Sequence, residues 1–498
     1  MSTSGLESRQ APLSMAPEEF RAAGHRLVDE IAGFLESLTH RPLNKDEAPS
    51  ALRALLPARL EEGGQDASRL LAETVPLLLE HSLFNGHPRF FGYITSSPAP
   101  IGALADLLAA AVNPNLGGWQ LSPIASEIEG QAVRWIAELL GLPDSTEGLL
   151  VSGGNSANFH CFLAARRAKG GEALRAGGLA AGPPLLVYAS TETHTWIQKA
   201  ADLFGHGTGS LRSIPVRADL TIDEGALVAQ LEADRRAGAR PFLLVGNAGT
   251  VSTGAVDPLA RLAEIARVHD LWFHVDGAYG ALALASDAAP PELQGLRAAD
   301  SVAVDPHKWL YAPLEAGCAL VRHAGALRDA FCYTPPYYRF DGEEQDPRTN
   351  YFELGLQNSR GFRALKVWLG LRQAGRAGYR AMIGDDIRLA RELYAAVAAH
   401  PRLEAMTQSL SIATFRYVPE GLAPGSENRL EYLSLLNEEL LHRLKASGEV
   451  FLSNAVVHGV FALRACIVNF RTTLADVRAV PGVVARHGEV VARALRGR

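Results

Sequence analysis

The chain has few cysteines, only four in 498 residues, and no two of them form a CxxC pair. Structural zinc sites and small disulfide-stabilised domains both need closely spaced cysteines, so this scarcity argues against a metal site and against a disulfide framework. Scattered free thiols are typical of a reducing compartment, and we expect a cytoplasmic location. The polar, Ser-rich residues 1–12 also lack the apolar stretch of a secretory signal peptide.

Long apolar runs and an excess of one charge sign are also missing. No run of about 18 apolar residues is present, so we expect no membrane span. The 48 basic and 54 acidic residues are interspersed, and the net charge is only −6. Without a basic stripe, we expect neither nucleic acid nor an anionic membrane as a partner.

The length and the 47% hydrophobic content suffice for two or three domains. In the middle of the chain, short apolar runs alternate with helical or loop segments. These runs are Leu149–Ser152, Leu185–Ala189, Phe242–Asn247, Leu271–Val275, Ser301–Val304 and Cys318–Val321. The alternation predicts an α/β domain over residues 101–384, with a largely parallel sheet and ligands at the strand ends.

Two smaller parts are expected to flank this domain. Residues 1–100 form an N-terminal helical segment, in which Ser14 caps an amphipathic helix that ends near Leu38 and has Pro17 in its first turn. This helix has little to pack on within its own segment, so we expect it to dock on a partner subunit. Residues 385–498 read as a small α+β domain, with apolar strand-like runs between longer helical ones.

A lysine and a carboxylate follow two of the strand-like runs. Lys308 stands in Asp305-Pro306-His307-Lys308-Trp309, directly after Ser301–Val304, and Asp276 directly follows Leu271–Val275. Taken alone, Lys308 is more often a solvated loop lysine and Asp276 a helix N-cap. Together they fit an enzyme that holds pyridoxal phosphate (PLP), because the lysine can form a Schiff base and the carboxylate can keep the pyridine nitrogen protonated.

Other residues complete such a site. Gly154, Asn155 and Ser156 precede a helix expected from Phe159 to Arg167, where backbone amides and a hydroxyl can hold a phosphate, although a plain tight turn fits equally. His194 follows a strand and can stack on the cofactor ring, or it can be a core or helix-capping histidine. At two further strand ends, Thr250 can bond near the ring oxygen and Ala278 leaves room under the ring.

Five separated motifs then point to one family. They are His87-Pro88-Arg89-Phe90-Phe91-Gly92-Tyr93, Trp119 with Ser122-Pro123 and Glu127, the stretch around His194, His274-Val275-Asp276, and Pro306-His307-Lys308-Trp309. In order and spacing the chain resembles the group II PLP-dependent decarboxylases, the family of aromatic-L-amino-acid, histidine and glutamate decarboxylases. The resemblance runs from His87 to about Lys366 and, more weakly, to the C-terminus. It implies the fold-type-I, aminotransferase-like architecture with a seven-stranded sheet, and a tight homodimer whose active sites are shared.

The resemblance also implies roles for individual residues. The catalytic residues are Lys308 as the Schiff-base lysine, Asp276 as the pyridinium partner, His194 as the ring-stacking histidine and Tyr337 as a proton donor. The cofactor-binding residues are Gly154, Asn155, Ser156, His194, Thr250, Asp276, Ala278, Asp305, His307 and Lys308. The substrate-binding residues are Phe91, Tyr93, Ser96, Leu116 and Trp119, and the segment 113–119 resembles a loop that enters the neighbouring subunit's site.

Three features depart from the family pattern. Asp305 stands where asparagine is frequent, and a bare carboxylate there repels a phosphate unless it is paired, turned away or protonated. Val251 replaces a frequent threonine and removes one contact to the ring oxygen. Leu116 and Gly117 are smaller than the side chains of the animal aromatic decarboxylases, which leaves the size of the substrate pocket open.

The segment from about 328 to 350 resembles the family's mobile catalytic loop. It is rich in Pro, Tyr and charge, and in the family it closes over the site and presents a tyrosine that protonates the carbanion left by CO2 loss. Tyr337 is the aligned residue and Tyr338 is the next candidate. Aldehyde synthases have phenylalanine here, so a tyrosine favours simple decarboxylation. Without the resemblance, an ordinary exposed loop is the default interpretation.

The sequence therefore predicts decarboxylation of an L-amino acid to its amine. An aromatic substrate is favoured by the cluster of Phe90, Phe91, Tyr93 and Trp119, and by the absence of an obvious extra arginine in the segments that build the pocket. An aliphatic, acidic or diamino substrate is the main alternative. An aldehyde synthase or an aminotransferase is a second alternative that uses the same cofactor.

Overall fold

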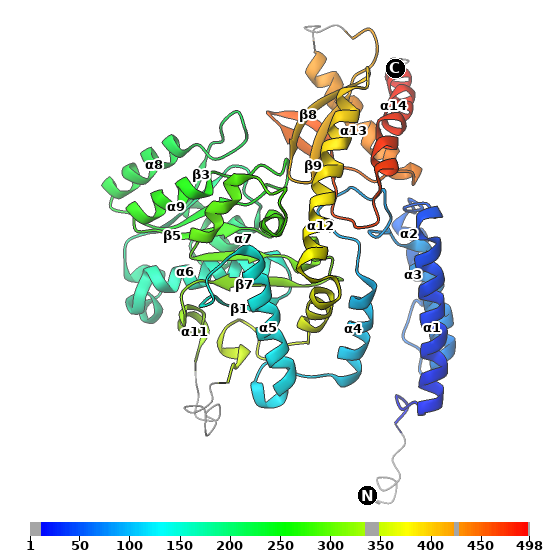
Figure 1. Ribbon diagram of the computed structural model, residues 1–498, viewed down its shortest axis with the longest axis horizontal. Helices are drawn as coiled ribbons and strands as arrows, with labels where there is room; N and C mark the ends of the chain where they lie inside the picture. Colours follow the sequence, from blue (N-terminus) through cyan, green and yellow to red (C-terminus); the bar gives the residue numbers. More distant parts are fainter. Residues whose placement is uncertain (1–10, 334–347, 423–427, 497–498) are drawn as a thin grey trace, which may run out of the picture.

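The largest unit of the protein is a seven-stranded sheet, seen in a computed structural model that describes residues 11–333, 348–422 and 428–496 (Figure 1). The strands are β1 (Glu147–Val151), β2 (Leu185–Ser190), β3 (Leu211–Ile214), β4 (Arg240–Asn247), β5 (Trp272–Asp276), β6 (Ser301–Val304) and β7 (Gly317–Val321). Their order is β1-β7-β6-β5-β4-β2-β3, and of these strands β7 alone runs antiparallel to its neighbours. Every apolar run predicted as a strand within residues 101–384 lies in this sheet, and the predicted mainly parallel α/β fold is confirmed.

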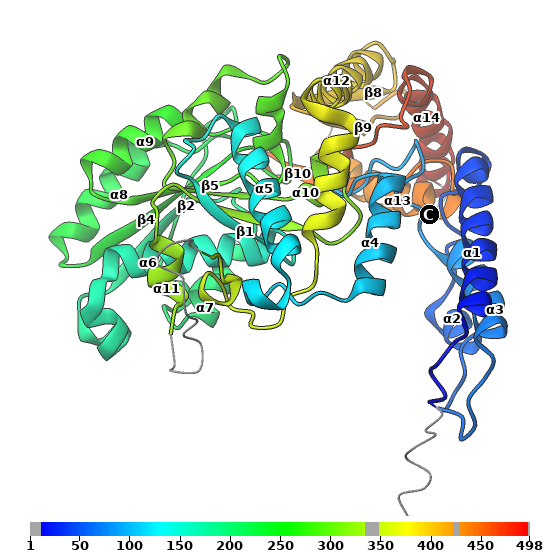
Figure 2. The same ribbon diagram turned by 60° about the horizontal axis from the view of Figure 1, so that its bottom comes forward.

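Helices cover both faces of the sheet (Figure 2). One face packs against α5 (Pro123–Leu140), α8 (Glu224–Arg236), α9 (Leu259–Val268) and the first half of α12 (Ala364–Ala398), and the other packs against α6 (Gly154–Gly177), α7 (Trp196–Leu203) and α11 (Ala326–Phe331). Neighbouring residues of one strand, such as Leu149 and Leu150, therefore belong to different cores. A strand with two buried faces has no polar side, which is why these strands are continuous apolar runs in the sequence.

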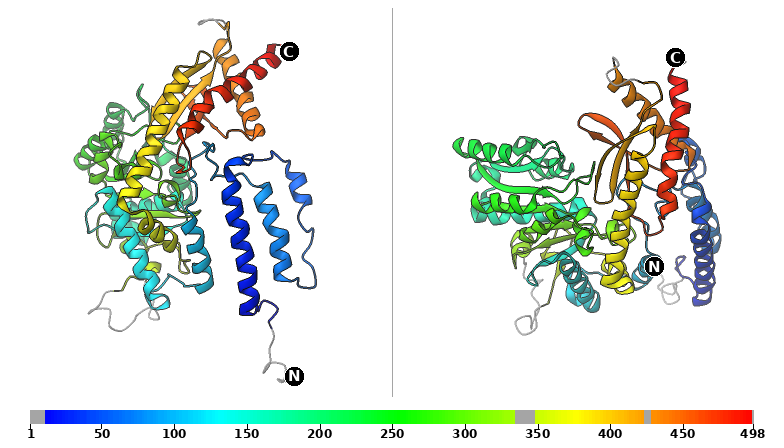
Figure 3. Two further views of the ribbon diagram at one scale, coloured as in Figure 1. Left: turned by 45° about the vertical axis from the view of Figure 1, so that its right-hand side comes forward. Right: turned by 45° about the horizontal axis from the view of Figure 1, so that its top comes forward.

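A smaller antiparallel sheet lies in the C-terminal part, in the order β10-β11-β9-β8. Its strands are β8 (Leu403–Ser409), β9 (Ile412–Tyr417), β10 (Ser453–Val457) and β11 (Val460–Cys466), and it packs with α13 (Arg429–Ser447) and α14 (Leu474–Arg496). The predicted α+β C-terminal part is confirmed. Helix α12 bends at Gly375, whose φ is +63°, and runs from the large sheet to the small one (Figures 1 and 3). The predicted boundary at residue 384 thus falls inside a helix.

The N-terminal segment forms α1 (Pro17–Ser37), α2 (Pro49–Ala54) and α3 (Ala67–His81), which stand beside the rest of the chain (Figure 3), followed by α4 (Pro100–Val112) against α12. Helix α1 begins at Pro17 after Ala16, and no side chain caps it. The predicted Ser14 cap is therefore wrong. Proline at the first position explains this start, since it sets a helical φ and lacks the N–H that a cap would satisfy.

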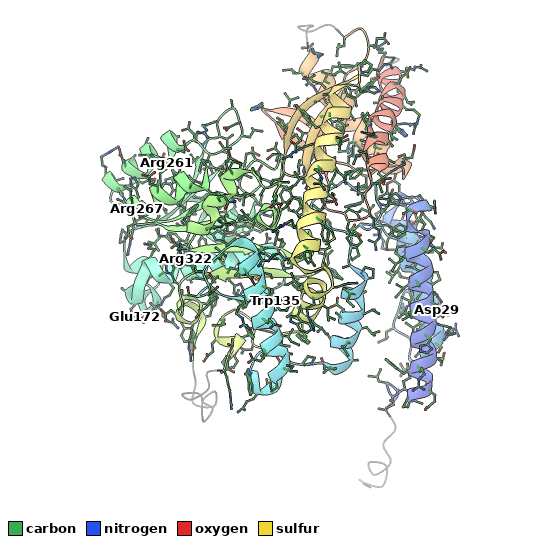
Figure 4. All side chains as sticks on the ribbon, in the orientation of Figure 1. Asp29, Trp135, Glu172, Arg261, Arg267 and Arg322 are labelled. Atoms are coloured by element: carbon green, nitrogen blue, oxygen red, sulfur yellow. The ribbon has the colours of Figure 1, made fainter. Side chains whose placement is uncertain are left out.

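Charged side chains mark the outer edge of the large sheet's helices. Glu172, Arg261, Arg267 and Arg322, labelled in Figure 4, lie on the side that faces away from α12 in that view. Throughout the described ranges, no helix is both long and apolar enough to cross a bilayer.

Candidate functional site

A cavity of about 410 Å³ lies where β4, β5 and β6 end. Asn247 of β4 pairs with Asp276 of β5, and Asp276 pairs with Ala303 of β6, so the carboxyl ends of these parallel strands meet at one edge. The predicted residues that line the cavity are Gly154, Asn155, His194, Thr250, Asp276, Ala278, Asp305, His307 and Lys308. The fold thus brings together side chains that the sequence spreads over several segments.

Lys308 lies in the short helix α10 (Pro306–Trp309) and forms an ion pair inside the cavity. Its Nζ is 3.0 Å from Oδ2 of Asp305, and His307 Nε2 is 3.8 Å from the same oxygen. Asp305 is only 2% exposed, and its Oδ1 has no hydrogen-bond partner among the described residues. The carboxylate that replaces the family's asparagine is therefore paired, with one oxygen still able to accept a hydrogen bond.

Asp276 has a fixed orientation at the end of β5. Its Oδ2 accepts a hydrogen bond of 2.7 Å from Trp196 Nε1, and its Oδ1 accepts one of 3.2 Å from the Ala278 amide. The Trp196 ring packs edge-on against His274, at a centroid distance of 5.6 Å. Because its two donors are themselves held by packing and by the backbone, the carboxylate keeps one orientation towards the cavity.

His194 presents a neutral imidazole to the cavity. Burial lowers the pKa of His194 below its usual value, although the charge of Asp276 acts in the opposite direction. The Trp196 amide donates a hydrogen bond of 3.2 Å to Nδ1, so the proton of the neutral ring is on Nε2. Asn247 Nδ2 holds the preceding loop through a 3.1 Å hydrogen bond to Thr193 Oγ1.

The beginning of α6 forms another part of the cavity wall, next to Asp305. The helix begins at Gly154, earlier than the predicted Phe159, and its first backbone hydrogen bond joins the Ala157 amide to the Gly153 carbonyl at 3.0 Å. The amides that precede Ala157 are left without helical partners and can bind an anion. A Cβ on Gly154 would lie 2.6 Å from Asp305 Oδ2, so only glycine leaves this wall open.

Comparison with known proteins decides what this cavity belongs to. The family described as pyridoxal-dependent decarboxylase conserved domain matches residues 49–418. The chain belongs to this family. It is a PLP-dependent amino-acid decarboxylase.

The similarity to individual known proteins extends over nearly the whole chain of this decarboxylase. The chain is 33% identical to the aromatic-L-amino-acid decarboxylase of Bacillus atrophaeus over 471 residues, which is 93% of this chain and 94% of that one. The crystal structure of Oryza sativa TDC with PLP and tryptamine matches with a TM-score of 0.89 and 28% identity, over 97% of this chain and 99% of that one. The 4-hydroxyphenylacetaldehyde synthase of Rhodiola rosea matches with a TM-score of 0.85 and 27% identity, over 96% and 99% of the two chains.

The residues of the cavity fit PLP. Unpaired amides at the beginning of α6, with no side chain on Gly154, suit a phosphate group. A lysine amine and an oriented carboxylate, Lys308 and Asp276, line the same space and suit the aldehyde and the pyridine nitrogen. The buried Oδ1 of Asp305 has no hydrogen-bond partner among the described residues and can still accept one hydrogen bond.

Two residues that were predicted to bind the substrate are buried in the interior of this decarboxylase. Phe91 is fully buried in the core of the C-terminal sheet, where its amide donates to the Phe451 carbonyl at 2.8 Å. Leu116 is also fully buried, and its carbonyl accepts a 3.2 Å hydrogen bond from Arg360. Neither side chain lines the cavity, so their contact with substrate stays a prediction.

The other predicted residues that the structure describes, Ser156, Ser96, Tyr93 and Trp119, do not line the cavity. Ser96 donates a 2.8 Å hydrogen bond to the His307 carbonyl, which places it directly behind α10. Tyr93 is half-exposed, and Trp119 donates a 2.8 Å hydrogen bond to Glu127. Tyr337, with its neighbour Tyr338, lies outside the described residues, and its role as proton donor stays a prediction.

Several lining residues were not predicted. They are Ile94, Ser152, Gly153, Asn158, Glu192, Asn247, Gly249, Tyr279, Leu314 and Glu315. Val251, which departs from the family pattern, also lines the cavity. Asn247 could have been found, because it ends a predicted strand beside Asp276. Leu314 and Glu315 come from a loop without any pattern, and only the fold shows that they face the cavity.

Proposed function

We propose that this decarboxylase acts on an aromatic L-amino acid and releases the aromatic amine and CO2. The observation that carries the proposal is a second cavity of about 300 Å³, which shares His307 and Leu314 with the first. Its wall is mostly apolar and includes Phe34, Leu35, Leu38, Leu83, Phe84, Pro98 and Pro313. An apolar space beside the reacting groups favours an aromatic side chain, since burying apolar surface stabilises binding by about 25 cal/mol per Å². The names of the bacterial and plant relatives support the same class.

The cavity's own residues divide the chemistry among them. PLP, when bound, supplies a conjugated ring that accepts the electron pair left at Cα as CO2 departs. Asp276, oriented by Trp196, stabilises the proton on the pyridine nitrogen, and Lys308 would hold the cofactor through Nζ. His194 keeps its proton on Nε2, which can donate a hydrogen bond to the substrate carboxylate. Holding that carboxylate selects the bond to CO2 as the one that breaks.

An acidic substrate is the second candidate, and one residue favours it. Arg471 lines the second cavity, and its guanidinium contacts the Ser97 hydroxyl and lies 4.6 Å from the centre of the Phe470 ring. Within the part of the chain that the structure describes, no carboxylate pairs with it. Such a cation can pair with a distal carboxylate of a substrate.

A panel of substrates separates the two candidates. The purified protein with PLP is incubated with the twenty common amino acids and DOPA, and amines are detected by mass spectrometry. We expect amines from tyrosine, DOPA, tryptophan or phenylalanine. An enzyme that acts on glutamate or aspartate alone would overturn the proposal. In that case Arg471→Gln should raise KM for the acidic substrate roughly 10- to 100-fold, because it removes a hydrogen bond to a charged group. Arg478 is exposed, and Arg478→Gln is the control that should leave KM unchanged.

Tyr337→Phe is expected to convert amine formation towards aldehyde formation. A phenyl ring cannot give a proton to Cα, so the electron pair at Cα persists. Dioxygen can take up these two electrons and two protons to give hydrogen peroxide, and water then hydrolyses the resulting C=N bond to aldehyde and ammonia. Amine and peroxide are measured together for Tyr337→Phe, Tyr338→Phe and Tyr333→Phe. Tyr333, whose ring lies 4.4 Å from the Arg175 guanidinium carbon, is the control. Peroxide from Tyr338→Phe instead would show that Tyr338 is the donor.

We also propose a homodimer with shared active sites. Helix α4 exposes about half or more of Leu104, Leu107, Leu108 and Val112, and α1 exposes Phe20 in the same way. An exposed apolar helix face such as that of α4 marks a contact with another chain. The exposed apolar residues of α1 and α4 are not covered by the described part of their own chain. A second copy of the chain is therefore the partner that we propose for them.

Sedimentation equilibrium should therefore give a mass of twice 53.3 kDa. The double variant Leu104→Glu, Leu108→Glu places charge in the proposed interface and should yield an inactive monomer. Leu203→Glu, at an equally exposed leucine on α7, is the control and should remain dimeric. A fully active wild-type monomer would contradict the proposal.

A further inference from the structure

The short helix that carries Lys308 is tied to α12 by two side chains that follow the lysine. Trp309 Nε1 and Tyr311 OH each donate a hydrogen bond of 2.8 Å to Oδ2 of Asp386. Helix α10 has only four residues, and so short a helix cannot hold its own geometry. The position of Lys308 therefore depends on what its neighbours contact.

The tie is rigid because its members are buried and close-packed. Trp309, Tyr311 and Asp386 are each at most 1% exposed. The Trp309 ring also stacks on Tyr279 at 5.0 Å, with an angle of 20° between the planes. Tyr279 lies three residues beyond Asp276 in the chain, so the same tryptophan is packed against the segments that carry both cofactor residues.

A third contact also joins α12 to the residues that follow Lys308. Tyr379 of α12 donates a hydrogen bond of 3.1 Å to the Leu310 carbonyl, and the Tyr311 and Tyr379 rings stack at 6.4 Å. The Asp386 carboxyl group thus belongs to a layer of aromatic rings between α10 and α12. Because Asp386 lies in α12, these contacts connect the segment that carries Lys308 to the helix that leads into the C-terminal sheet.

Burial of the Asp386 carboxyl group costs free energy. Burial raises the pKa of Asp386 to about 7, and the hydrogen bonds from Trp309 and Tyr311 only partly offset that cost. The remaining neighbours that act on it are the Asn469 backbone and the carboxylate of Asp385, and neither adds a positive charge. A buried carboxyl group with these partners orients its two hydrogen-bond donors more than it stabilises the fold.

We infer that Asp386 is a positioning residue for Lys308, which it fixes in the cavity through Trp309 and Tyr311. The inference rests on the proposed role of Lys308 as the lysine that holds PLP. Asp386 itself does not line the cavity, so its influence passes through the backbone of α10. Loss of either donor should let Lys308 and His307 shift together.

The chain offers a matched control for one hydrogen bond of this network. Tyr188 is also fully buried and donates a 2.8 Å hydrogen bond to a carboxylate, Asp234, on the side of β2 that faces α8. Tyr188→Phe and Tyr311→Phe therefore remove the same hydroxyl from the same kind of partner. They differ in that only Tyr311 is connected to the turn that carries Lys308.

The experiment compares Tyr311→Phe, Trp309→Phe and Asp386→Asn with Tyr188→Phe and wild type, all as holoenzymes. Measured are the dissociation constant of PLP, the visible circular dichroism of bound PLP, and kcat and KM separately. We expect the first three variants to lose roughly 10- to 100-fold in kcat, since a shift of about 1 Å at a reacting group can cost about 100-fold. They should also bind PLP more weakly and with an altered circular dichroism signal, whereas Tyr188→Phe should change thermal stability alone.

Equal kcat, PLP affinity and circular dichroism for Tyr311→Phe and Tyr188→Phe would overturn the inference, even if Asp386→Asn failed to fold. A different failure concerns the proposed function. A wild-type protein that binds no PLP through Lys308, judged by borohydride reduction and peptide mass spectrometry, would remove the role of Lys308 and this inference with it. The two failures are distinguished by whether the wild-type protein is loaded.

Discussion

Replacing Lys308 by alanine is expected to leave a folded protein without covalently held PLP and without decarboxylase activity. The Lys308 amine lines the cavity beside Asp276, at the end of neighbouring strands, and no other lysine lines it among the described residues. Removing the amine removes the covalent bond to the cofactor and the exchange that releases it to the substrate. The measurements are the visible absorbance of the purified variant, and peptide mass spectrometry after borohydride reduction.

A lysine in a comparable ion pair provides the control. Lys366 is buried and pairs with Asp106 at 3.1 Å, much as Lys308 pairs with Asp305 at 3.0 Å, but it does not line the cavity. Both alanine variants leave a carboxylate without its lysine, but Asp305 is buried whereas Asp106 is 43% exposed, so Lys308→Ala is expected to lose more thermal stability than Lys366→Ala. Lys366→Ala should keep the PLP absorbance. A reducible cofactor linkage that survives in Lys308→Ala would refute the assignment.

Asp276→Asn should lower kcat by about 100- to 1,000-fold, the effect of removing one oriented electrostatic contact from a reacting site. The amide oxygen can still accept the 2.7 Å hydrogen bond from Trp196 Nε1, and only the longer 3.2 Å bond from the Ala278 amide is lost, so the fold and the cavity wall should persist. The substituted side chain carries no negative charge, however, and it no longer stabilises a proton on the pyridine nitrogen. The ring then accepts the electron pair from Cα less readily, and the step that releases CO2 slows.

Asp234→Asn tests whether this loss is specific. Asp234 is a buried carboxylate that accepts hydrogen bonds from Tyr188 and Arg212, away from the cavity. Its amide variant should lose stability and keep kcat, whereas Asp276→Asn should do the reverse. Steady-state kinetics and thermal melting of both variants decide the matter. Near-normal kcat in Asp276→Asn would show that another group holds the ring nitrogen proton.

The sequence alone predicted six of the seven strands of the large sheet and nine of the residues that line the candidate site. Strands such as β4 and β5 are buried on both faces, so they stand out as apolar runs, and ligands of such sheets gather at the strand ends. That rule connects Lys308 with Asp276 without a structure. The short edge strand β3 and the half-exposed strand β10 were missed, because partly exposed strands carry mixed side chains and little pattern.

The tertiary structure alone decided which side chains face the cavity and what holds them. Phe91 belongs to a conspicuous aromatic motif, yet pairing of that segment with the residues around Phe451 directs its ring into the C-terminal core. Asp386 has no motif and stands 77 residues beyond Trp309, but the packing of α12 brings the two within hydrogen-bond distance. Strand and turn propensities are local and can be read from neighbouring residues, whereas contacts between distant segments depend on how the whole chain packs.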